Sequence, residues 1–70
     1  MKTIIDREAK AAYITISTKP IQHSVVVTDS LVCDVDKEGD IVGIECINIS
    51  AQQIKILQEN ISHVAILEPK

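Results

Sequence analysis

The chain has 70 residues, enough for a single domain, and 46% are hydrophobic, with no Phe or Trp and one Tyr, so its core is small. The net charge of −3 comes without a Lys/Arg cluster or an aromatic stacking surface, which argues against direct nucleic-acid binding. No stretch resembles a signal peptide or a membrane span, so the sequence predicts a cytoplasmic protein without a membrane partner.

Three short strands are predicted in the first 30 residues, because apolar and polar residues alternate there with a period of two. They cover residues 3–5, 12–17 and 22–28. Pro20 separates the second from the third, since proline cannot donate to a strand ladder. This spacing is typical of an antiparallel meander.

Residues 34–45 have the sequence Asp-Val-Asp-Lys-Glu-Gly-Asp-Ile-Val-Gly-Ile-Glu, which fits the spacing of an EF-hand calcium loop. Such a loop joins two helices, but its flanks here alternate with a period of two. We therefore predict a β-hairpin with a turn from Asp36 to Gly39, in which Gly39 adopts a positive φ. The weak candidates for a metal site at this turn are Asp36, Glu38 and Asp40. The simpler interpretation is a solvated turn in which Asp36 hydrogen-bonds its own backbone.

The predicted register pairs Cys33 with Val42 and Leu31 with Ile44, which keeps the apolar residues on one face. A three-residue turn with a bulge at Gly39 would mix the two faces.

That register separates Asp34 from Glu45 by roughly 13 Å, so they cannot share a calcium ion. Cys33 and Cys46 are equally far apart, which predicts buried free thiols, as expected in a reducing compartment. A Cys₂His₂ zinc set would need Cys33, Cys46, His23 and His63. No two of these have the close spacing that zinc sites use. We therefore predict no cofactor.

A helix over residues 50–60 is predicted by a capping box formed by Ser50 and Gln53, with Asn60 as its C-terminal cap. Its apolar stripe consists of Ile54, Leu57 and Ile61. Residues 61–70 are rich in β-formers and are either a sixth strand or an interface segment. The sequence thus predicts one α+β domain over residues 1–70, with a meander of about five strands in residues 1–49 and a helix packed on one face.

Two segments resemble a known family. They are Ile-Asp-Arg-Glu-Ala-Lys-Ala-Ala-Tyr-Ile at residues 5–14 and Val-Cys-Asp-Val-Asp-Lys-Glu-Gly-Asp-Ile-Val-Gly-Ile-Glu-Cys-Ile-Asn at residues 32–48. The family consists of short bacterial and archaeal proteins catalogued only as a domain of unknown function. Its pattern is Tyr-Asp-x-Glu-Ala-Asp-Ala-Leu-Tyr-Ile, then Asp-x-Asp-x-x-Gly-x-Ile-Val-Gly-Ile-Glu, and the match covers about residues 2–50. This chain departs from it at Ile5, Lys10 and Ala12, and Lys10 reverses a charge.

The resemblance implies a small α+β protein with no established activity. Some members are thought to be encoded beside small toxin-like proteins, so it also makes an antitoxin or immunity role conceivable.

An interface is predicted where apolar side chains are expected on the outer sheet face and in the C-terminal tail. Its candidate residues are Tyr13, Ile41, Ile47, Val64 and Ile66. The first functional hypothesis is a non-enzymatic protein-interaction module, a homodimer or a complex with another protein, such as a small basic one. The alternative is a homo-oligomeric protein that binds a small ligand or a metal. An enzyme is disfavoured because few residues offer an acid, a base and a nucleophile.

Overall fold

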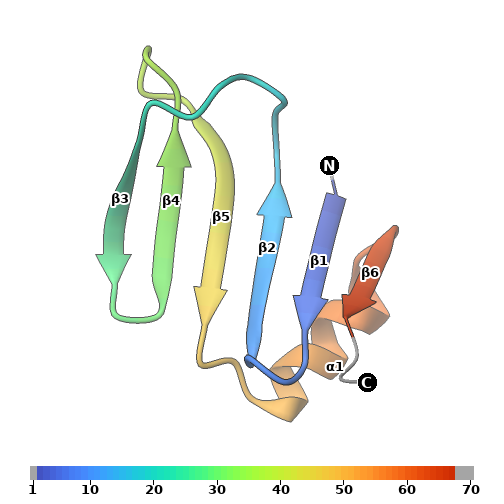
Figure 1. The fold of residues 1–70 in the computed structure, drawn as a ribbon. Coiled ribbons are helices and arrows are strands. Elements are labelled where there is room, and N and C mark those ends of the chain that lie inside the picture. Colours follow the sequence, from blue (N-terminus) through green and yellow to red (C-terminus); the bar gives the residue numbers. More distant parts are fainter. Residues whose placement is uncertain (1, 68–70) are drawn as a thin grey trace.

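The computed structural model describes residues 2–67, which form a six-stranded sheet with one helix on one face (Figure 1). The elements are β1 (Lys2–Asp6), β2 (Ala11–Thr15), β3 (His23–Thr28), β4 (Leu31–Val35), β5 (Ile41–Ile47), α1 (Ala51–Asn60) and β6 (Val64–Leu67). The predicted α+β class is confirmed, and so is the additional C-terminal strand. Residue 1 and residues 68–70 of the predicted domain lie outside the described part.

The order of the strands in the sheet is β3-β4-β5-β2-β1-β6. The meander runs through β3, β4 and β5, and β5 then pairs with β2 of the β1–β2 hairpin. β1 and β6 are parallel, and every other neighbouring pair is antiparallel. Because α1 lies between β5 and β6 in the chain, it carries the chain across the sheet face (Figure 1).

The predicted register of the β4–β5 hairpin is wrong by two residues. Cys33 pairs with Ile44 and Leu31 with Cys46, and the ladder is irregular between Asp34 and Val35. The prediction paired Val35 with Asp40 and assumed an unbroken ladder. In the structure Val35 pairs with Ile41, so the turn takes up one extra residue, and the irregularity takes up the second. A shift of two residues leaves each side chain on its predicted face, because side chains alternate with a period of two.

The corrected register brings two predicted pairs of residues closer together. Cys33 and Cys46 become diagonal neighbours on one face, which in a sheet are about 7–8 Å apart, rather than the predicted 13 Å. Both thiols are free, and both cysteines are half-buried rather than buried as predicted. Asp34 and Glu45 are also diagonal neighbours, because Asp34 pairs with Gly43.

The core lies between α1 and the β1–β2–β5 part of the sheet. It consists of Ile5, Ala12, Ile49 and Ile54, with Cys46, Leu57 and Val64 packed against it. The predicted capping box is present, since Ser50 accepts from the Gln53 amide and the Gln53 side chain accepts from the Ser50 amide. Asn60 is the last helical residue rather than the cap, which is the extended Ile61.

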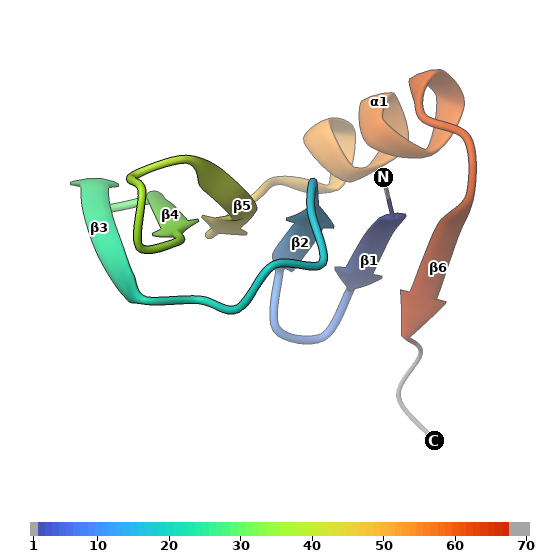
Figure 2. The same ribbon diagram turned by 90° about the horizontal axis from the view of Figure 1, so that it is seen from above.

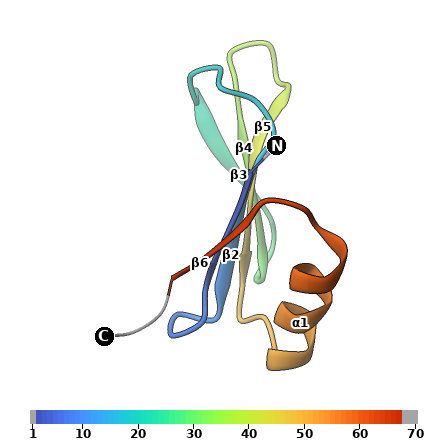
Figure 3. The same cartoon turned by 90° about the vertical axis from the view of Figure 1, so that its right-hand side faces the viewer.

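The helix covers only one end of the sheet. Viewed from above, α1 lies over the end formed by β2, β1 and β6, while β3 and β4 extend away from it beyond β5 (Figure 2). The side view places α1 on one face of the twisted sheet (Figure 3). Within residues 2–67, no helix is long and apolar enough to cross a membrane.

Candidate functional site

The edge strand β3 is the most exposed strand of the described chain. All six of its residues are exposed, and Val25, Val26 and Val27 keep 42%, 71% and 54% of their surface accessible. Within residues 2–67, β3 pairs only with β4, so its outer edge has no strand beside it. The main-chain groups along that edge are available to pair with another chain.

The exposed valines of β3 lie on both faces of the sheet. Val25 pairs with Cys33 and Val26 with Val32, and successive side chains of a strand point to opposite faces. The strand carries no Lys, Arg, Asp or Glu, the residues that usually protect an edge from pairing. One protective feature is present, because the ladder is irregular between Val26 and Thr28.

A hydrogen-bonded row of side chains crosses the face opposite the helix. The Tyr13 hydroxyl donates to Asp34 Oδ2 at 2.6 Å, and the Ser24 hydroxyl donates to Asp34 Oδ1 at 2.5 Å. These residues come from β2, β4 and β3, so the row connects the helix-covered end of the sheet to the bare end. Both hydrogen bonds favour the charged form of Asp34, and the bond from Tyr13 also favours the neutral form of Tyr13.

The pKa values in this row move away from neutrality. The hydrogen bond to Asp34 raises the pKa of Tyr13 to about 12, and burial and the nearby carboxylates of Asp34 and Glu45 add to the effect. The hydrogen bonds from Ser24 and then Tyr13 lower the pKa of the Asp34 carboxyl. Asp34 is therefore a charged acceptor at neutral pH, committed to two donors within the protein.

Gly43 lets the Tyr13 side chain reach across β5 to β4. A Cβ atom at position 43 would overlap the Tyr13 hydroxyl and lie 2.6 Å from the ring carbon Cζ. Only a residue without a side chain leaves space for the ring at this point. The sequence showed Gly43 inside a strand, but the ring that crosses it comes from β2 and became apparent only from the sheet order.

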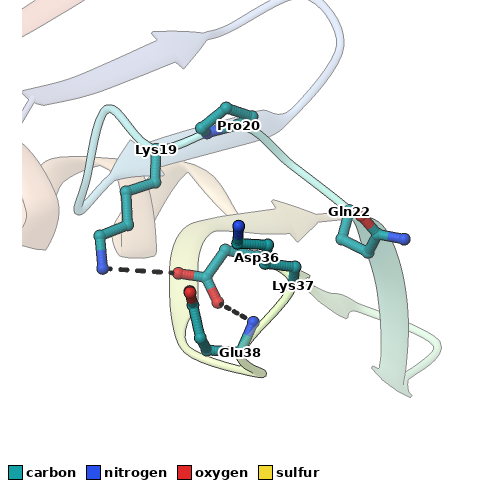
Figure 4. A pocket seen from close by; sticks show the side chains of 6 residues that line it. All are labelled: Lys19, Pro20, Gln22, Asp36, Lys37 and Glu38. Carbon is teal, nitrogen blue, oxygen red and sulfur yellow. Dashed lines mark hydrogen bonds and ion pairs between the residues drawn. The ribbon is translucent and has the colours of Figure 1, made fainter.

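The β4–β5 turn holds the acidic residues that were candidates for a metal site. Carboxylate oxygens of Asp36, Glu38 and Asp40 lie within 4.8 Å of one another. Asp36 is buried, with 2% of its surface exposed, whereas Glu38 and Asp40 are exposed. Figure 4 shows the Lys19 side chain pointing toward the Asp36 carboxylate. Both residues line an open hollow of about 340 Å³ beside the turn.

Asp36 stabilises this turn by accepting hydrogen bonds from its main chain. Its Oδ1 accepts from the amides of Glu38 and Asp40 at 3.0 and 2.9 Å, as predicted, and Gly39 has a φ of 88°. Its Oδ2 accepts no hydrogen bond and lies 3.8 Å from the Lys19 ammonium. Burial alone would raise the pKa of Asp36, but the two amide donors and Lys19 hold that pKa below its usual value. The connection between β2 and β3, which contains Lys19, thus already supplies the positive charge that faces this carboxylate.

The four zinc candidates do not form one metal site. Among residues 2–67, the turn acids are the only cluster of three or more His, Cys, Asp or Glu with metal-site spacing, so the four zinc candidates are not one site. Burial raises the pKa of the Cys46 thiol, and the neighbouring Cys33 and Glu45 act in the same direction. A raised pKa leaves less reactive thiolate at neutral pH, so Cys46 is suited to packing.

The predicted interface residues are spread over the fold rather than gathered on one surface. Tyr13 is half-buried over Gly43, and Val64 packs against the core under α1. Ile41 and Ile47 lie at opposite ends of β5, where Ile41 is 45% exposed and Ile47 is half-buried. Ile66 is half-buried in β6. Sequence reasoning missed β3 as the main exposed surface, although three consecutive valines in an uncharged strand were a visible signal.

Comparison with known proteins places the chain in a family. The sequence model of DUF2283, described as a protein of unknown function, matches residues 2–50. The chain belongs to this family. The DUF2283 match runs from β1 to the N-cap residue of α1, so it contains the bare end of the sheet, the Tyr13–Asp34 pair and the acidic turn. No curated protein and no solved structure matches the chain.

Proposed function

We propose that this DUF2283 chain is a non-enzymatic protein-interaction module that binds another protein by adding a strand to β3. The observation that carries the proposal is the exposure of all six β3 residues along an open, uncharged edge. Strand addition suits such an edge, because main-chain hydrogen bonds supply affinity while alternate side chains supply specificity. The valines on both faces of β3 would contact the side chains of the added strand.

A binding role is further supported by the pKa values in the described chain. A general acid or base works best with a pKa near the operating pH. The resolved shifts instead move each group away from neutrality, upward for Tyr13 and Cys46 and downward for Asp34 and Asp36. These groups are suited to holding the sheet and its turn in place.

Two kinds of partner suit this module: a second copy of the chain, and a small basic protein, which the net charge of −3 would attract weakly over long range. A module that binds and covers a small basic protein would act as an antitoxin or immunity-like protein, the role that the family resemblance suggests. A pairing between β3 and one strand of the partner covers only one edge of the sheet, so it leaves α1 and the core unchanged.

The test compares two lysine substitutions at opposite edges of the sheet. Tagged wild type, Val26→Lys and the matched control Leu67→Lys, which changes a 53% exposed residue of β6, are used to capture proteins from extracts of the source cells. We expect a stoichiometric partner with wild type and the control, and its loss with Val26→Lys. A partner retained equally by Val26→Lys would refute binding through β3.

A second candidate function, a homo-oligomeric protein that binds a cation or small ligand, is favoured by one observation. The three carboxylates of the acidic turn converge within 4.8 Å, and oxygen ligands suit calcium. The test is a calcium titration followed by calorimetry, comparing wild type with the double variant Glu38→Gln/Asp40→Asn. Saturable heat with wild type alone would support this function, and equal responses would refute it.

A further inference from the structure

The chain exposes more surface than a compact monomer of its size. Its accessible surface is 5041 Å² for a mass of 7.7 kDa. The scaling for folded monomers gives about 4300 Å² at this mass, so the excess is about 700 Å². Each partner of a standard protein–protein interface buries about 800 Å². The excess therefore has the size of one partner's share of an interface.

The shape of the molecule points to the same conclusion. The radius of gyration is 12.4 Å and the longest dimension is 36 Å. A compact chain of this length has a radius of gyration of about 11 Å. The sheet is elongated because β3 and β4 extend beyond the helix-covered part (Figure 2). The surface that a partner would cover is therefore concentrated at the β3 end.

The β3 strand is complementary to a second copy of itself. In an antiparallel pair related by a two-fold axis, directly opposite side chains point to the same face, so one residue must lie opposite its own copy and the axis passes beside Val25 or Val26, near the middle of the strand. Charged side chains are absent from β3, so no like charges meet across the axis, although each chain carries a net charge of −3. Valines would face valines at the centre, with the polar His23 and Thr28 at the two ends.

Pairing at the edge explains the exposure of β3 better than packing of one sheet face. Val25 and Val26 lie on opposite faces and are 42% and 71% exposed, so a partner stacked on either face would leave one of them bare. A strand added at the edge gives side-chain neighbours to both faces and also satisfies the main chain. The opposite edge, β6, has only four residues, and its Val64 and Ile66 are half-buried.

We infer that the occupant of the β3 edge is a second copy of this chain, which pairs antiparallel through β3 to make one continuous sheet of twelve strands, twice the six of a single chain. This inference rests on the proposed binding function of β3 and identifies its partner. The two helix-covered ends lie at the far ends of the joined sheet. Pairing at the edge then buries part of the exposed valine surface of β3, in line with the need of small domains for additional burial.

The test measures mass and hydrogen exchange on the same samples. Sedimentation equilibrium of wild type should give twice 7.7 kDa, and Leu67→Lys should behave in the same way. Val26→Lys places two ammonium groups near the axis and should weaken dimerisation at least about tenfold. Because Val26 is 71% exposed, its circular dichroism spectrum should stay that of the folded chain. The β3 amides that point away from β4 should exchange slowly in the wild-type dimer and quickly in Val26→Lys, while the paired amides of β1 and β2 stay protected in both.

Each other outcome would overturn the inference. A wild type that is monomeric at high protein concentration refutes the second copy. A dimer that persists unchanged in Val26→Lys, or that leaves the β3 amides unprotected, refutes the site. Failure here is distinguishable from failure of the proposed function. A monomer whose β3 amides become protected by a captured partner keeps the binding role and loses only the second copy.

Discussion

Replacing Gly43 with alanine tests whether the Tyr13 side chain, lying across β5, stabilises the sheet. The added Cβ would overlap the Tyr13 hydroxyl, with Cζ at 2.6 Å, so the ring must move or the strands must separate. Overpacking of this kind costs about 1–3 kcal/mol, and losing a hydrogen bond to the charged Asp34 costs about 1.5–3 kcal/mol. The overlap is severe and neither route avoids a cost, so we expect a loss in the upper part of these ranges, about 2–3 kcal/mol in the free energy of unfolding.

The control is the same substitution in a chain that lacks the ring. In a Tyr13→Ala background nothing occupies the space above position 43, and alanine is favoured over glycine in a strand by roughly 0.5–1 kcal/mol. Gly43→Ala should therefore be neutral or slightly stabilising there. The double-mutant cycle then gives a coupling energy of at least about 2 kcal/mol between the two positions.

Urea denaturation followed by far-ultraviolet circular dichroism measures all four proteins, because Tyr13, the only aromatic residue, is absent from two of them. One protein concentration is used throughout, since self-association would otherwise alter the apparent stability. A 2–3 kcal/mol loss corresponds to a decrease in Tm of about 10–20 °C for a domain of this size. If the costs of Gly43→Ala and Tyr13→Ala simply add, the ring does not depend on the glycine, and the reasoning is refuted.

Three further predictions concern single residues. The pKa of Tyr13, raised from about 10 to about 12, implies stability that is complete below pH 10 and lost as the pH rises through 12; Asp34→Asn should move the tyrosinate absorbance midpoint down toward 10, and an unchanged midpoint would contradict the contact. Ser50→Ala removes the cap of α1 and should lower the free energy of unfolding by about 1 kcal/mol in urea denaturation, whereas no loss would show that the capping box contributes nothing. Lys10 has a φ of 54°, which asparagine tolerates better than lysine. Lys10→Asn should therefore raise the free energy of unfolding by about 0.5 kcal/mol, seen as a higher urea midpoint. A lower midpoint would mean that the lysine side chain stabilises the turn.

Local interactions made parts of the fold predictable from the sequence. The capping box needs only Ser50 and Gln53, three residues apart, and it forms as expected. The acidic turn likewise depends on Asp36 accepting from nearby amides and on a positive φ at Gly39. Such bonds close within a few residues, so the sequence pattern contains all their partners.

Long-range pairing decided the remaining features. The hairpin register was wrong by two residues because alternation fixes the face of a side chain but not the residue opposite, and the turn and a ladder irregularity together take up the difference. The partner of the Tyr13 hydroxyl followed from the pairing of β2 with β5, which brings Asp34 within reach across Gly43. The exposed surface was misplaced for the same reason.

By itself, the sequence of this DUF2283 chain determined the fold class, the helix with its N-terminal cap and the acidic hairpin turn. Only the tertiary structure decided that β6 pairs parallel to β1 and that β3 lies at an open edge beyond the reach of α1. A period-two pattern specifies which side chains share a face, whereas strand order depends on contacts between distant segments, whose loop-closure entropy and packing no local pattern contains. The valines of β3 are apolar in either case, and their position at the end of the sheet leaves them exposed.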